Sequence, residues 1–368
     1  MTSSVSSPLP LVKVAMPPRE RLMPALEEVL YSGMIGEGEA VYEFERRFGE
    51  QFGLPRALAT SSGTGALHVA LLLSGAGPGR EVITTSMTAE PTNTVIMQTG
   101  ATPVFADVDP DTGNLSPAAV QAAVTERTAA ICVVHYAGYP ADLAALRAIA
   151  DRHEIGLIED CAHALGARYA GKPIGTIGDS AIFSLQAIKH MTTVDGGILG
   201  LRDPAQTLLA KQLRWFGLTK GVPRTEVDIK RPGFKYNMSN VTATIGLQQL
   251  DHIDGLIARH CNNGRFFDRE LAAIAGIKPA VVLAEANPSY WIYTLLADNS
   301  DEVEQCLAAI GVSASKLHRP NHFHSAFAPF AGPMPGLDSF YQRLVHIPSG
   351  WWVGDEDRQR IIDALAKG

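Results

Sequence analysis

Cysteine is scarce in this 368-residue chain, and its four copies are isolated from one another. None belongs to a CxxC pair, so neither a zinc site nor a disulfide framework is indicated. Isolated free cysteines are usually buried and behave as small apolar residues. We therefore expect no bound metal and four reduced thiols, at Cys132, Cys161, Cys261 and Cys306.

Positive charge is also in short supply. The chain has 31 Lys and Arg against 38 Asp and Glu, and its formal net charge is −7. This balance gives no basic footprint for nucleic acid or anionic membranes, although a local pocket for a phosphate stays compatible with it. Hydrophobic residues make up 46% and charged residues 19% of the chain, which is typical of a globular protein with a sizeable core. We expect small-molecule partners and no nucleic acid.

Long hydrophobic runs are absent as well. The longest apolar stretches, such as Ala129–Val134, are far too short to span a bilayer. The N-terminus is polar and Ser-rich over Thr2–Ser7, and it lacks a basic region followed by an apolar run. We therefore expect no membrane partner and a cytoplasmic location.

The chain is longer than one hydrophobic core usually supports, which predicts two domains. We place an N-terminal arm and a large domain in residues 1–245, and a smaller C-terminal α+β domain in residues 246–368. No internal repeat or low-complexity linker separates the two.

The middle of the chain, from residue 57 to residue 201, alternates short β-rich runs with helical ones. This alternation predicts right-handed crossovers and a large doubly wound, mostly parallel sheet, hence an α/β fold. Ligands of such sheets bind beyond the carboxyl ends of the strands. The expected strands are Glu81–Thr85, Thr102–Asp107, Ala129–His135, Gly156–Asp160 and Ala181–Ser184, and helices are expected over Ser116–Val124 and Asp142–His153.

The two ends of the chain show mainly helical periodicity. The segment Pro18–Phe52 reads as a helix, a Gly-rich loop and a second helix, and an amphipathic run extends from Val241 to about Ala275. In the C-terminal part we expect a strand at Tyr290–Leu296 and helices near Asp301–Ile310 and Asp355–Ala366.

One group of residues suited to binding or catalysis is an apolar strand that ends in two acids, Leu157-Ile158-Glu159-Asp160. A carboxylate at the end of a buried strand is costly unless a cation meets it. The protonated nitrogen of a bound heterocycle would be such a cation. A helix N-cap, a metal ligand or a hydrogen-bonding role for Asp160 remains the alternative.

A second constellation surrounds Lys189, which has Ile188 and Met191 as apolar neighbours. Desolvation there would lower its pKa and make a neutral, nucleophilic amine available for imine formation. Gly196-Gly197 ahead of an apolar pair suggests a turn into another strand, which places the lysine on a loop with reach into a cleft. The alternative is an amphipathic lysine that extends to solvent.

A third constellation is the small-residue turn Ser61-Ser62-Gly63-Thr64-Gly65, which opens directly into a helical run. Exposed backbone N–H groups and the positive end of a helix dipole suit a phosphate, and glycine permits its close approach. The spacing matches neither a Walker loop nor GxGxxG. A plain Ser-capped helix is the alternative.

Together with the segments 33–38, 100–105 and 233–240, these motifs resemble the nucleotide-sugar aminotransferases of the DegT/StrS type. That family is a branch of the fold-type I enzymes that use pyridoxal 5'-phosphate (PLP). The resemblance covers nearly the whole chain. It implies a fold-type I PLP-dependent transferase whose large N-terminal domain binds the cofactor.

The resemblance also implies roles for individual residues. Lys189 falls on the Schiff-base lysine, Asp160 on the partner of the pyridinium nitrogen, and His163 on the residue near the ring's phenolic oxygen. The phosphate cup would contain Gly63, Thr64 and Ser184. Lys235 is the candidate for reaching the cofactor phosphate of a neighbouring subunit, which implies a homodimer with shared active sites.

Several positions depart from the family's usual pattern. Ala89 occupies the position where family members place an aromatic residue that stacks on the cofactor ring, and His190 stands where Asn is common. Lys235 and Asn237 replace the frequent Asn and Arg of their stretch. Lys189 itself speaks against a dehydratase branch that carries histidine at this position.

The segment Leu317–His324 also lacks close agreement with the family, and it contains His318, His322 and His324. We expect it to line the substrate site. Three neighbouring histidines could instead bind a metal, but loop histidines without carboxylate or cysteine partners are more often solvated.

The activity that the resemblance implies is transfer of an amino group from glutamate or glutamine to a keto-sugar nucleotide, which forms an amino sugar. Two alternatives stay open. One is other PLP chemistry, such as dehydration or cyclisation, on a related sugar. The other is a PLP-binding sensor without turnover, although the chain has no basic tail or DNA-binding appendage to support it.

Overall fold

The structure is a computed structural model that describes residues 8–367, so the Ser-rich start at residues 2–7 lies outside the described part. A seven-stranded sheet forms the centre of the molecule, with the strand order β1-β9-β8-β5-β4-β2-β3. Its strands are β1 (Ala57–Thr60), β2 (Glu81–Thr84), β3 (Thr102–Phe105), β4 (Thr128–Val134), β5 (Gly156–Asp160), β8 (Ser180–Ser184) and β9 (Gly197–Leu201). Strand β9 runs antiparallel to both of its neighbours, whereas the pairs from β8 to β3 are parallel. The predicted mostly parallel α/β sheet is confirmed.

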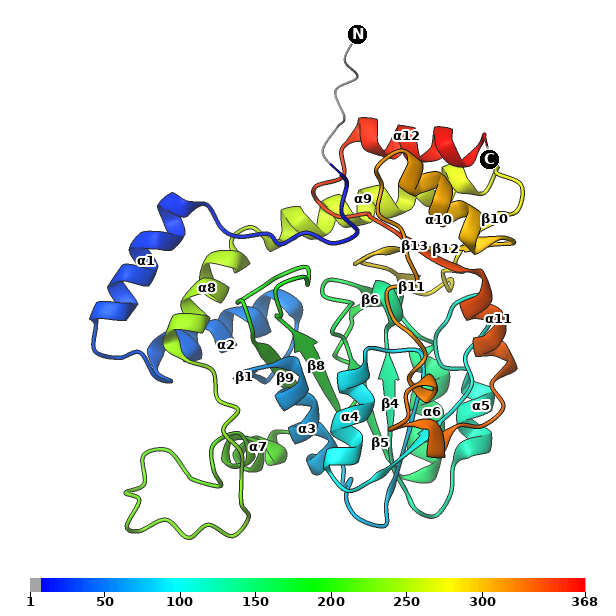
Figure 1. The fold of residues 1–368 in the computed structure, drawn as a ribbon. Helices are drawn as coiled ribbons and strands as arrows, with labels where there is room; N and C mark the ends of the chain where they lie inside the picture. The colour runs from blue at the N-terminus through cyan, green and yellow to red at the C-terminus, as the bar shows by residue number, and fades with distance from the viewer. Residues whose placement is uncertain (1–7, 368) are drawn as a thin grey trace.

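Helices cover both faces of this sheet (Figure 1). Strand residues alternate between the two faces, so neighbouring apolar residues serve different cores. Ile83, Ile131 and Leu157 belong to one core with α2 (Glu39–Phe52), α5 (Pro117–Ala123) and α6 (Leu143–His153). The next positions, including Cys132 and Ile158, belong to another core with α3 (Gly63–Leu73), α4 (Glu90–Gln98) and α7 (Thr207–Arg214).

The predicted helix, loop and helix at the N-terminal end are present as α1 (Arg19–Tyr31) and α2. The long amphipathic run, in contrast, is broken at residues 251–252 into α8 (Asn240–Leu250) and α9 (Ile253–Leu271). Helix α8 packs against α1 and α2, while α9 continues toward the C-terminal part (Figure 1).

The C-terminal part has its own antiparallel sheet, in the order β10-β12-β13. The predicted strand is present as β12, three residues late at its start, and the two predicted helices are present as α10 and α12. The predicted domain boundary after residue 245 falls inside α8, and the division into two domains stays a prediction. The elements are β10 (Ile277–Pro279), β12 (Tyr293–Ala297), α10 (Ser300–Ala309), α11 (Pro335–Arg343), β13 (Leu344–Ile347) and α12 (Asp355–Leu365).

Smaller elements complete the fold. A three-stranded ribbon has the order β11-β6-β7. All four cysteines are free, and Cys132 and Cys161 are buried. Within residues 8–367, no helix combines the length and the apolar character that crossing a bilayer requires. The short elements are β6 (Arg168–Tyr169), β7 (Lys172–Pro173), β11 (Ala286–Asn287) and the single 3-10 turns η1 (Tyr136–Gly138), η2 (Pro204–Gln206), η3 (Asn321–Phe323) and η4 (Ala328–Phe330).

Candidate active site

A cavity of about 380 Å³ lies at the carboxyl ends of β5 and β8. Its walls are the first turn of α3, the segment 88–92 at the start of α4, and the loop that joins β8 to β9. This is the edge of the sheet at which the topology predicted a ligand site. Six of the seven predicted site residues line it together: Gly63, Thr64, Asp160, His163, Ser184 and Lys189.

Asp160 is the last residue of β5, and its register partners are Val134 of β4 and Ile182 of β8. Its side chain lies at the cavity but is only 3% exposed overall. One carboxylate oxygen accepts a hydrogen bond from Thr92 Oγ1 at 2.9 Å, and the other accepts one from the Ala162 amide at 3.1 Å. Burial raises the pKa of Asp160, while these hydrogen bonds and the charge of Lys189 act in the opposite direction. A cation in the cavity would stabilise this carboxylate.

Lys189 lies on the loop between β8 and β9, as the Gly-Gly turn predicted. Its amide donates to Gln186 O at 3.0 Å, which makes a tight turn around the lysine. Burial lowers the pKa of Lys189 to about 7, and the nearby Asp160 charge raises it only in part. The neutral amine that the apolar neighbours predicted is therefore available near neutral pH.

The first turn of α3 faces the same cavity. Ser62 caps the helix by accepting from the Gly65 amide at 3.0 Å. Within the described chain, the amides of Gly63 and Thr64 find no acceptor, as expected for the first positions of a helix. A Cβ on Gly63 would lie 3.0 Å from Ser184 Cβ, so glycine lets the helix start close to the end of β8. These free N–H groups and the helix dipole suit an anion.

His163 lines the cavity, and one of its ring nitrogens is unpaired. Its Nδ1 is buried and has no hydrogen-bond partner among the described residues. Burial, followed by the charge of Lys189, holds the pKa of His163 well below its ordinary value, so the imidazole is neutral. The ring stacks on Trp291 with centroids 4.1 Å apart and an interplanar angle of 18°.

A sequence model of the DegT/DnrJ/EryC1/StrS aminotransferase family matches residues 18–366. The chain belongs to this family. Its curated relatives include the spore coat polysaccharide biosynthesis protein SpsC of Bacillus subtilis, which is 32% identical over 356 residues and 92% of each chain. The aminotransferase is therefore a PLP-dependent enzyme, as the resemblance implied.

Solved structures agree with this assignment. The sugar aminotransferase CalS13 of Micromonospora echinospora is 36% identical, with a TM-score of 0.94 over 98% of this chain and 100% of that one. The protein Spr1654 of Streptococcus pneumoniae, solved in a PLP form, is 27% identical, with a TM-score of 0.88 over 97% and 98% of the two chains. The aminotransferase has their fold-type I architecture.

The cavity residues fit PLP. The phosphate of PLP needs hydrogen-bond donors, and the free amides of the α3 terminus supply them. Its ring nitrogen needs an acid, and Asp160 is a buried carboxylate with room for a cationic partner. The Nδ1 of His163 has no partner among the described residues, and a substituent on the PLP ring could provide one.

Ala89 is the residue that the resemblance places where family members have a stacking aromatic ring. Ala89 lines the cavity just before α4. Within residues 8–367, no Phe, Tyr or Trp is among the cavity-lining residues. The loss of the stacking ring at Ala89 stays a prediction.

Lys235 lies apart from the other predicted site residues. Its side chain is exposed, with Nζ 2.7 Å from Asn237 Oδ1 and 4.1 Å from the centroid of the Trp215 ring. It does not line the cavity of its own chain. Its predicted role toward a neighbouring subunit stays a prediction.

Two residues that contact the site centre were not assigned a role there from the sequence: Thr92 binds Asp160, and Trp291 contacts Lys189 and His163. His318, which belongs to the segment expected to line the substrate site, stacks near His163 with centroids 5.5 Å apart. Thr92 had a local signal, because it follows the 84–91 segment that the family places at the cofactor. Trp291 had none, since its contact partners lie more than 100 positions away in the sequence.

The histidines of the segment Leu317–His324 do not gather around one point. His322 Nδ1 lies 2.8 Å from Ser86 Oγ, and His324 Nε2 lies 3.6 Å from Glu90 Oε1. The segment thus packs against the residues that precede and begin α4, at the margin of the cavity. Its expected role in lining the substrate site stays a prediction.

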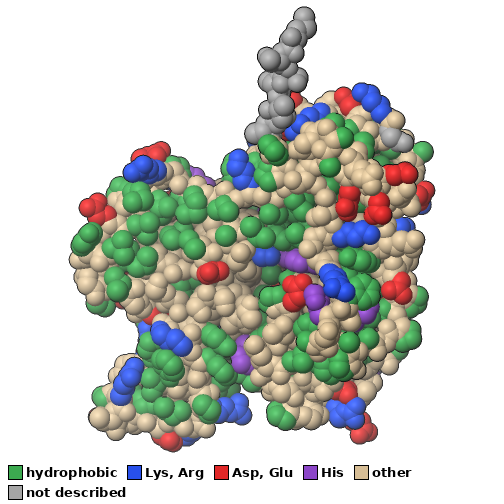
Figure 2. All heavy atoms as spheres, in the orientation of Figure 1, with side chains coloured by type: hydrophobic (Ala, Val, Ile, Leu, Met, Phe, Trp, Pro, Cys, Tyr) green, Lys and Arg blue, Asp and Glu red, His purple; other side chains and the backbone are tan. Residues whose placement is uncertain are grey.

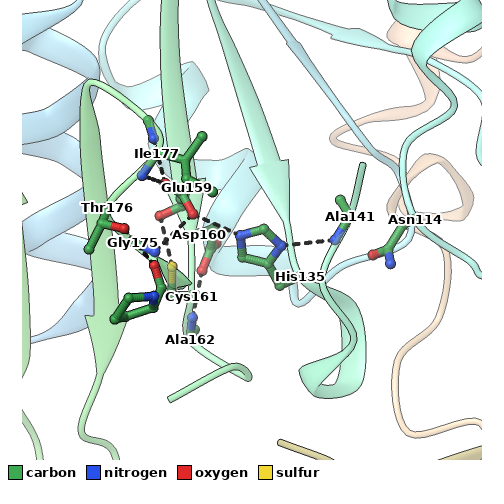
Figure 3. Close-up of polar contacts among 12 residues, drawn as sticks. Asn114, His135, Ala141, Glu159, Asp160, Cys161, Ala162, Gly175, Thr176 and Ile177 are labelled. Carbon is green, nitrogen blue, oxygen red and sulfur yellow. Dashed lines mark hydrogen bonds and ion pairs between the residues drawn. The ribbon is translucent and has the colours of Figure 1, made fainter. Parts of the chain in front are cut away.

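A separate buried cluster next to Asp160 offers ligand types that metals use: His135, Glu159 and Cys161 lie within 4.8 Å of one another. Figure 3 shows that Glu159 already accepts hydrogen bonds from the turn before β8, at 2.8 Å from the Gly175 amide and 2.9 Å from the Ile177 amide. His135 Nε2 donates to the same carboxylate at 3.3 Å.

The remaining atoms of this cluster also have partners. His135 Nδ1 accepts from the Ala141 amide at 3.1 Å, so Nε2 is the nitrogen that donates to Glu159. Burial raises the pKa of the Cys161 thiol well above its ordinary value, and the Glu159 charge adds to the shift. The cluster is satisfied by protein groups, and it ties β4, β5 and the turn before β8 together (Figure 3).

Proposed function

We propose that this aminotransferase moves an amino group from glutamate or glutamine to the ketone of a sugar carried on a nucleotide diphosphate. The proposal rests on three features of one cavity: the amine of Lys189, whose pKa is about 7, the buried carboxylate of Asp160, and the free amides at the start of α3. The amino-sugar product is supported by the sugar aminotransferase CalS13 and the polysaccharide protein SpsC among its relatives.

Bound PLP supplies an electrophilic carbon that amines attack and a ring that accepts electrons when the neighbouring carbon loses a proton. In this proposal Lys189 would hold the cofactor covalently. Once a substrate amine had displaced it, the lysine would carry the proton between the substrate carbon that bears the amine and the cofactor carbon that the amine attacked. A pKa of about 7 suits that task, because both protonation states are populated at neutral pH.

Asp160 keeps the ring nitrogen protonated in this proposal. Its carboxylate is fixed by Thr92 and the Ala162 amide, so it needs no rearrangement to meet a cation. Gly63, Thr64 and Ser184 hold the phosphate at the α3 terminus. His163 is neutral and its ring is held against Trp291, and it would lie beside the ring oxygen of the cofactor.

The proposed enzyme is a homodimer with shared sites. Helix α1 projects from the body of the molecule, and it buries only Leu22 (Figure 1). Hydrophobic side chains gather over this arm in Figure 2, and the exposed ones include Leu30, Tyr31, Met34 and Ile35. A contiguous apolar surface of this kind is typical of a protein contact. In the proposed dimer a second copy covers this surface, and Lys235 reaches the cofactor phosphate of the neighbouring subunit.

The test of the activity is a panel of nucleotide-linked keto-sugars with glutamate or glutamine as the donor, read by mass spectrometry. We expect the mass change of ketone to amine on at least one sugar. We also expect one equivalent of 2-oxoglutarate per site when the enzyme meets glutamate without an acceptor. Release of 2-oxoglutarate together with a dehydrated or cyclised sugar would contradict the proposed reaction. No release of 2-oxoglutarate from glutamate and none of 2-oxoglutaramate from glutamine would favour a sensor.

Lys189→Ala is the decisive variant for this proposal. We expect it to lose transamination and all borohydride-stable attachment of PLP, because binding alone cannot replace the covalent link. Peptide mass spectrometry after borohydride reduction of the parent enzyme gives the matching measurement, and it should find the label on Lys189. A label on another lysine would remove Lys189 from this role.

A further inference from the structure

The loop that carries Lys189 is attached on both sides of the lysine to one distant segment, Ser289–Trp291. Trp291 Nε1 donates a hydrogen bond to the carbonyl of Ile188 at 2.9 Å. His190 Nε2 lies 3.1 Å from the carbonyl of Ser289, and since a carbonyl only accepts, the imidazole donates. The residues that flank Lys189 are therefore held by a segment about 100 positions away.

The lysine side chain itself contacts the same segment. Lys189 Nζ lies over the Trp291 ring, 4.0 Å from its centroid. The indole is 1% exposed and belongs to the core of the C-terminal part, so it has little freedom to move. A cation above an indole face is attracted by the ring's charge distribution, and the attraction is stronger where water is excluded.

We propose that Trp291 is a positioning residue for Lys189. Its indole face holds the free ammonium of the lysine in the cavity, and its N–H fixes the backbone of the loop through Ile188. Its value for catalysis rests on the proposed role of Lys189, because the lysine needs a defined place whenever a substrate amine has displaced it from the cofactor. The segment Ser289–Trp291 thus couples the C-terminal part of the chain to the reacting lysine.

The other titratable groups around Lys189 do not mask the effect of the Trp291 indole on the pKa of the lysine. Asp160, at the end of β5, is the carboxylate that acts on it. His163, His190 and His318 also face it, and burial lowers the pKa of all three, to about 4 for His318, so they are neutral near pH 7. Removal of the indole should therefore lower the pKa of Lys189, since burial would remain and a stabilising partner of the ammonium would be gone.

The test is competitive labelling of the full-length enzyme, freed of PLP, with acetic anhydride across pH 5 to 10. The label on the Lys189 peptide is read by mass spectrometry. We expect a midpoint near 7 in the parent enzyme. In Trp291→Leu the midpoint should fall by about one pH unit, which corresponds to the loss of a desolvated cation–π contact. In Trp291→Phe, which keeps an aromatic face, it should fall by less than about half of that.

A second measurement isolates the backbone contact. Trp291→Phe cannot donate to Ile188 O, so the rate of borohydride-trapped PLP attachment should fall by about three- to tenfold, even though the labelling midpoint stays near that of the parent. Trp352→Leu is the matched control. Trp352 also donates its indole N–H to a backbone carbonyl, that of Pro10, but it has no contact with Lys189. We expect parental midpoint and attachment rate in this variant.

Each outcome decides the proposal. A Trp291→Leu protein that is folded by circular dichroism and keeps the parental midpoint overturns it, as does an equal shift in Trp352→Leu. If Trp291→Leu does not fold, parental attachment kinetics in Trp291→Phe overturn it. The labelling midpoint does not depend on turnover. The midpoint can therefore support the role of Trp291 even if the keto-sugar panel shows no activity. A borohydride label on another lysine would contradict only the proposed function.

Discussion

Two adjacent carboxylates at the end of β5 show how environment separates residues of similar chemistry. Glu159 and Asp160 point to opposite faces of the strand. Burial works against the charge of Glu159, but His135 and the amides of the turn before β8 lower its pKa overall. Asp160 has only two hydrogen-bond donors, and burial raises its pKa. The hydrogen bonds of Glu159 are therefore supplied by the protein, whereas the carboxylate of Asp160 can still bind a cation in the cavity.

Asp160→Asn should retain PLP binding but slow the reaction with glutamate by about two orders of magnitude. An amide cannot keep the ring nitrogen protonated, so the electron sink weakens. The rate of 2-oxoglutarate release in a single turnover measures the effect. Asp363→Asn, on the surface of α12, is the matched control and should behave as the parent. A rate for Asp160→Asn within a few fold of the parent would exclude this role.

The pKa of Lys189 predicts a pH dependence for cofactor attachment. The amine is the reactive form, and it appears as pH rises through about 7 rather than through the ordinary value of 10.5. The initial rate of borohydride-trapped attachment should therefore rise about tenfold between pH 6 and pH 8 and change little above pH 8. A rate that keeps rising tenfold per unit up to pH 9 would show that burial does not depress this pKa.

At the scale of elements, the site depends on how closely α3 starts beside the ends of β8 and β9. A Cβ on Gly197, the first residue of β9, would lie 2.5 Å from the amide nitrogen of Gly63. Gly63 in turn lies against Ser184 at the end of β8. The two glycines bring the free amides of the helix to the wall of the cavity, where an anion can reach them.

Gly63→Ala should therefore weaken PLP binding without unfolding the protein. The added methyl group must displace Ser184 or the first turn of α3 by a few tenths of an ångström, which misaligns the donors for the phosphate. We expect the apparent Kd for PLP to rise by about tenfold, the equivalent of one charge-assisted hydrogen bond. Fluorescence titration measures this. Gly255→Ala on α9, where a Cβ meets nothing within 4 Å, serves as the control and should keep the parental Kd.

At the scale of the whole molecule, the single chain exposes an apolar surface around α1, of the kind that is typical of a protein contact. Tyr31 at the end of α1 is 86% exposed, and Met34 in the following loop is 65% exposed. Lys235 is also exposed, and it remains outside the cavity of its own chain. Both features are explained if a second copy packs against this side, because most soluble oligomers are symmetric dimers or are built from them.

Subunit mixing tests this arrangement. Lys189→Ala and Lys235→Glu should each be inactive alone. In a mixed dimer, one site takes Lys189 from one chain and Lys235 from the other, so random 1:1 mixing should restore about a quarter of the parental activity. Full activity of Lys235→Glu alone would contradict the shared site. So would an active parent enzyme that sediments as a monomer.

The fold was predictable where local patterns decide structure, and less so elsewhere. The strands β2, β4 and β5 are continuous apolar runs between turn signals, and the sequence predicted them within one or two residues. Strands β10 and β13 were not predicted, because each is short and forms only against β12. The break between α8 and α9 was missed because the apolar periodicity continues across it, although the two helices pack against different parts of the chain.

The sequence by itself determined the chemistry of the site. A lysine among apolar residues, an acid at a strand end and a small-residue turn before a helix are all patterns of residues adjacent in the chain, so Lys189, Asp160 and the start of α3 could be predicted from it. Only the tertiary structure decided which groups surround them. Thr92 reaches Asp160 across 68 positions, and Trp291 reaches the Lys189 loop across about 100. Such contacts arise from packing between elements, which leaves no periodic or local trace in the sequence.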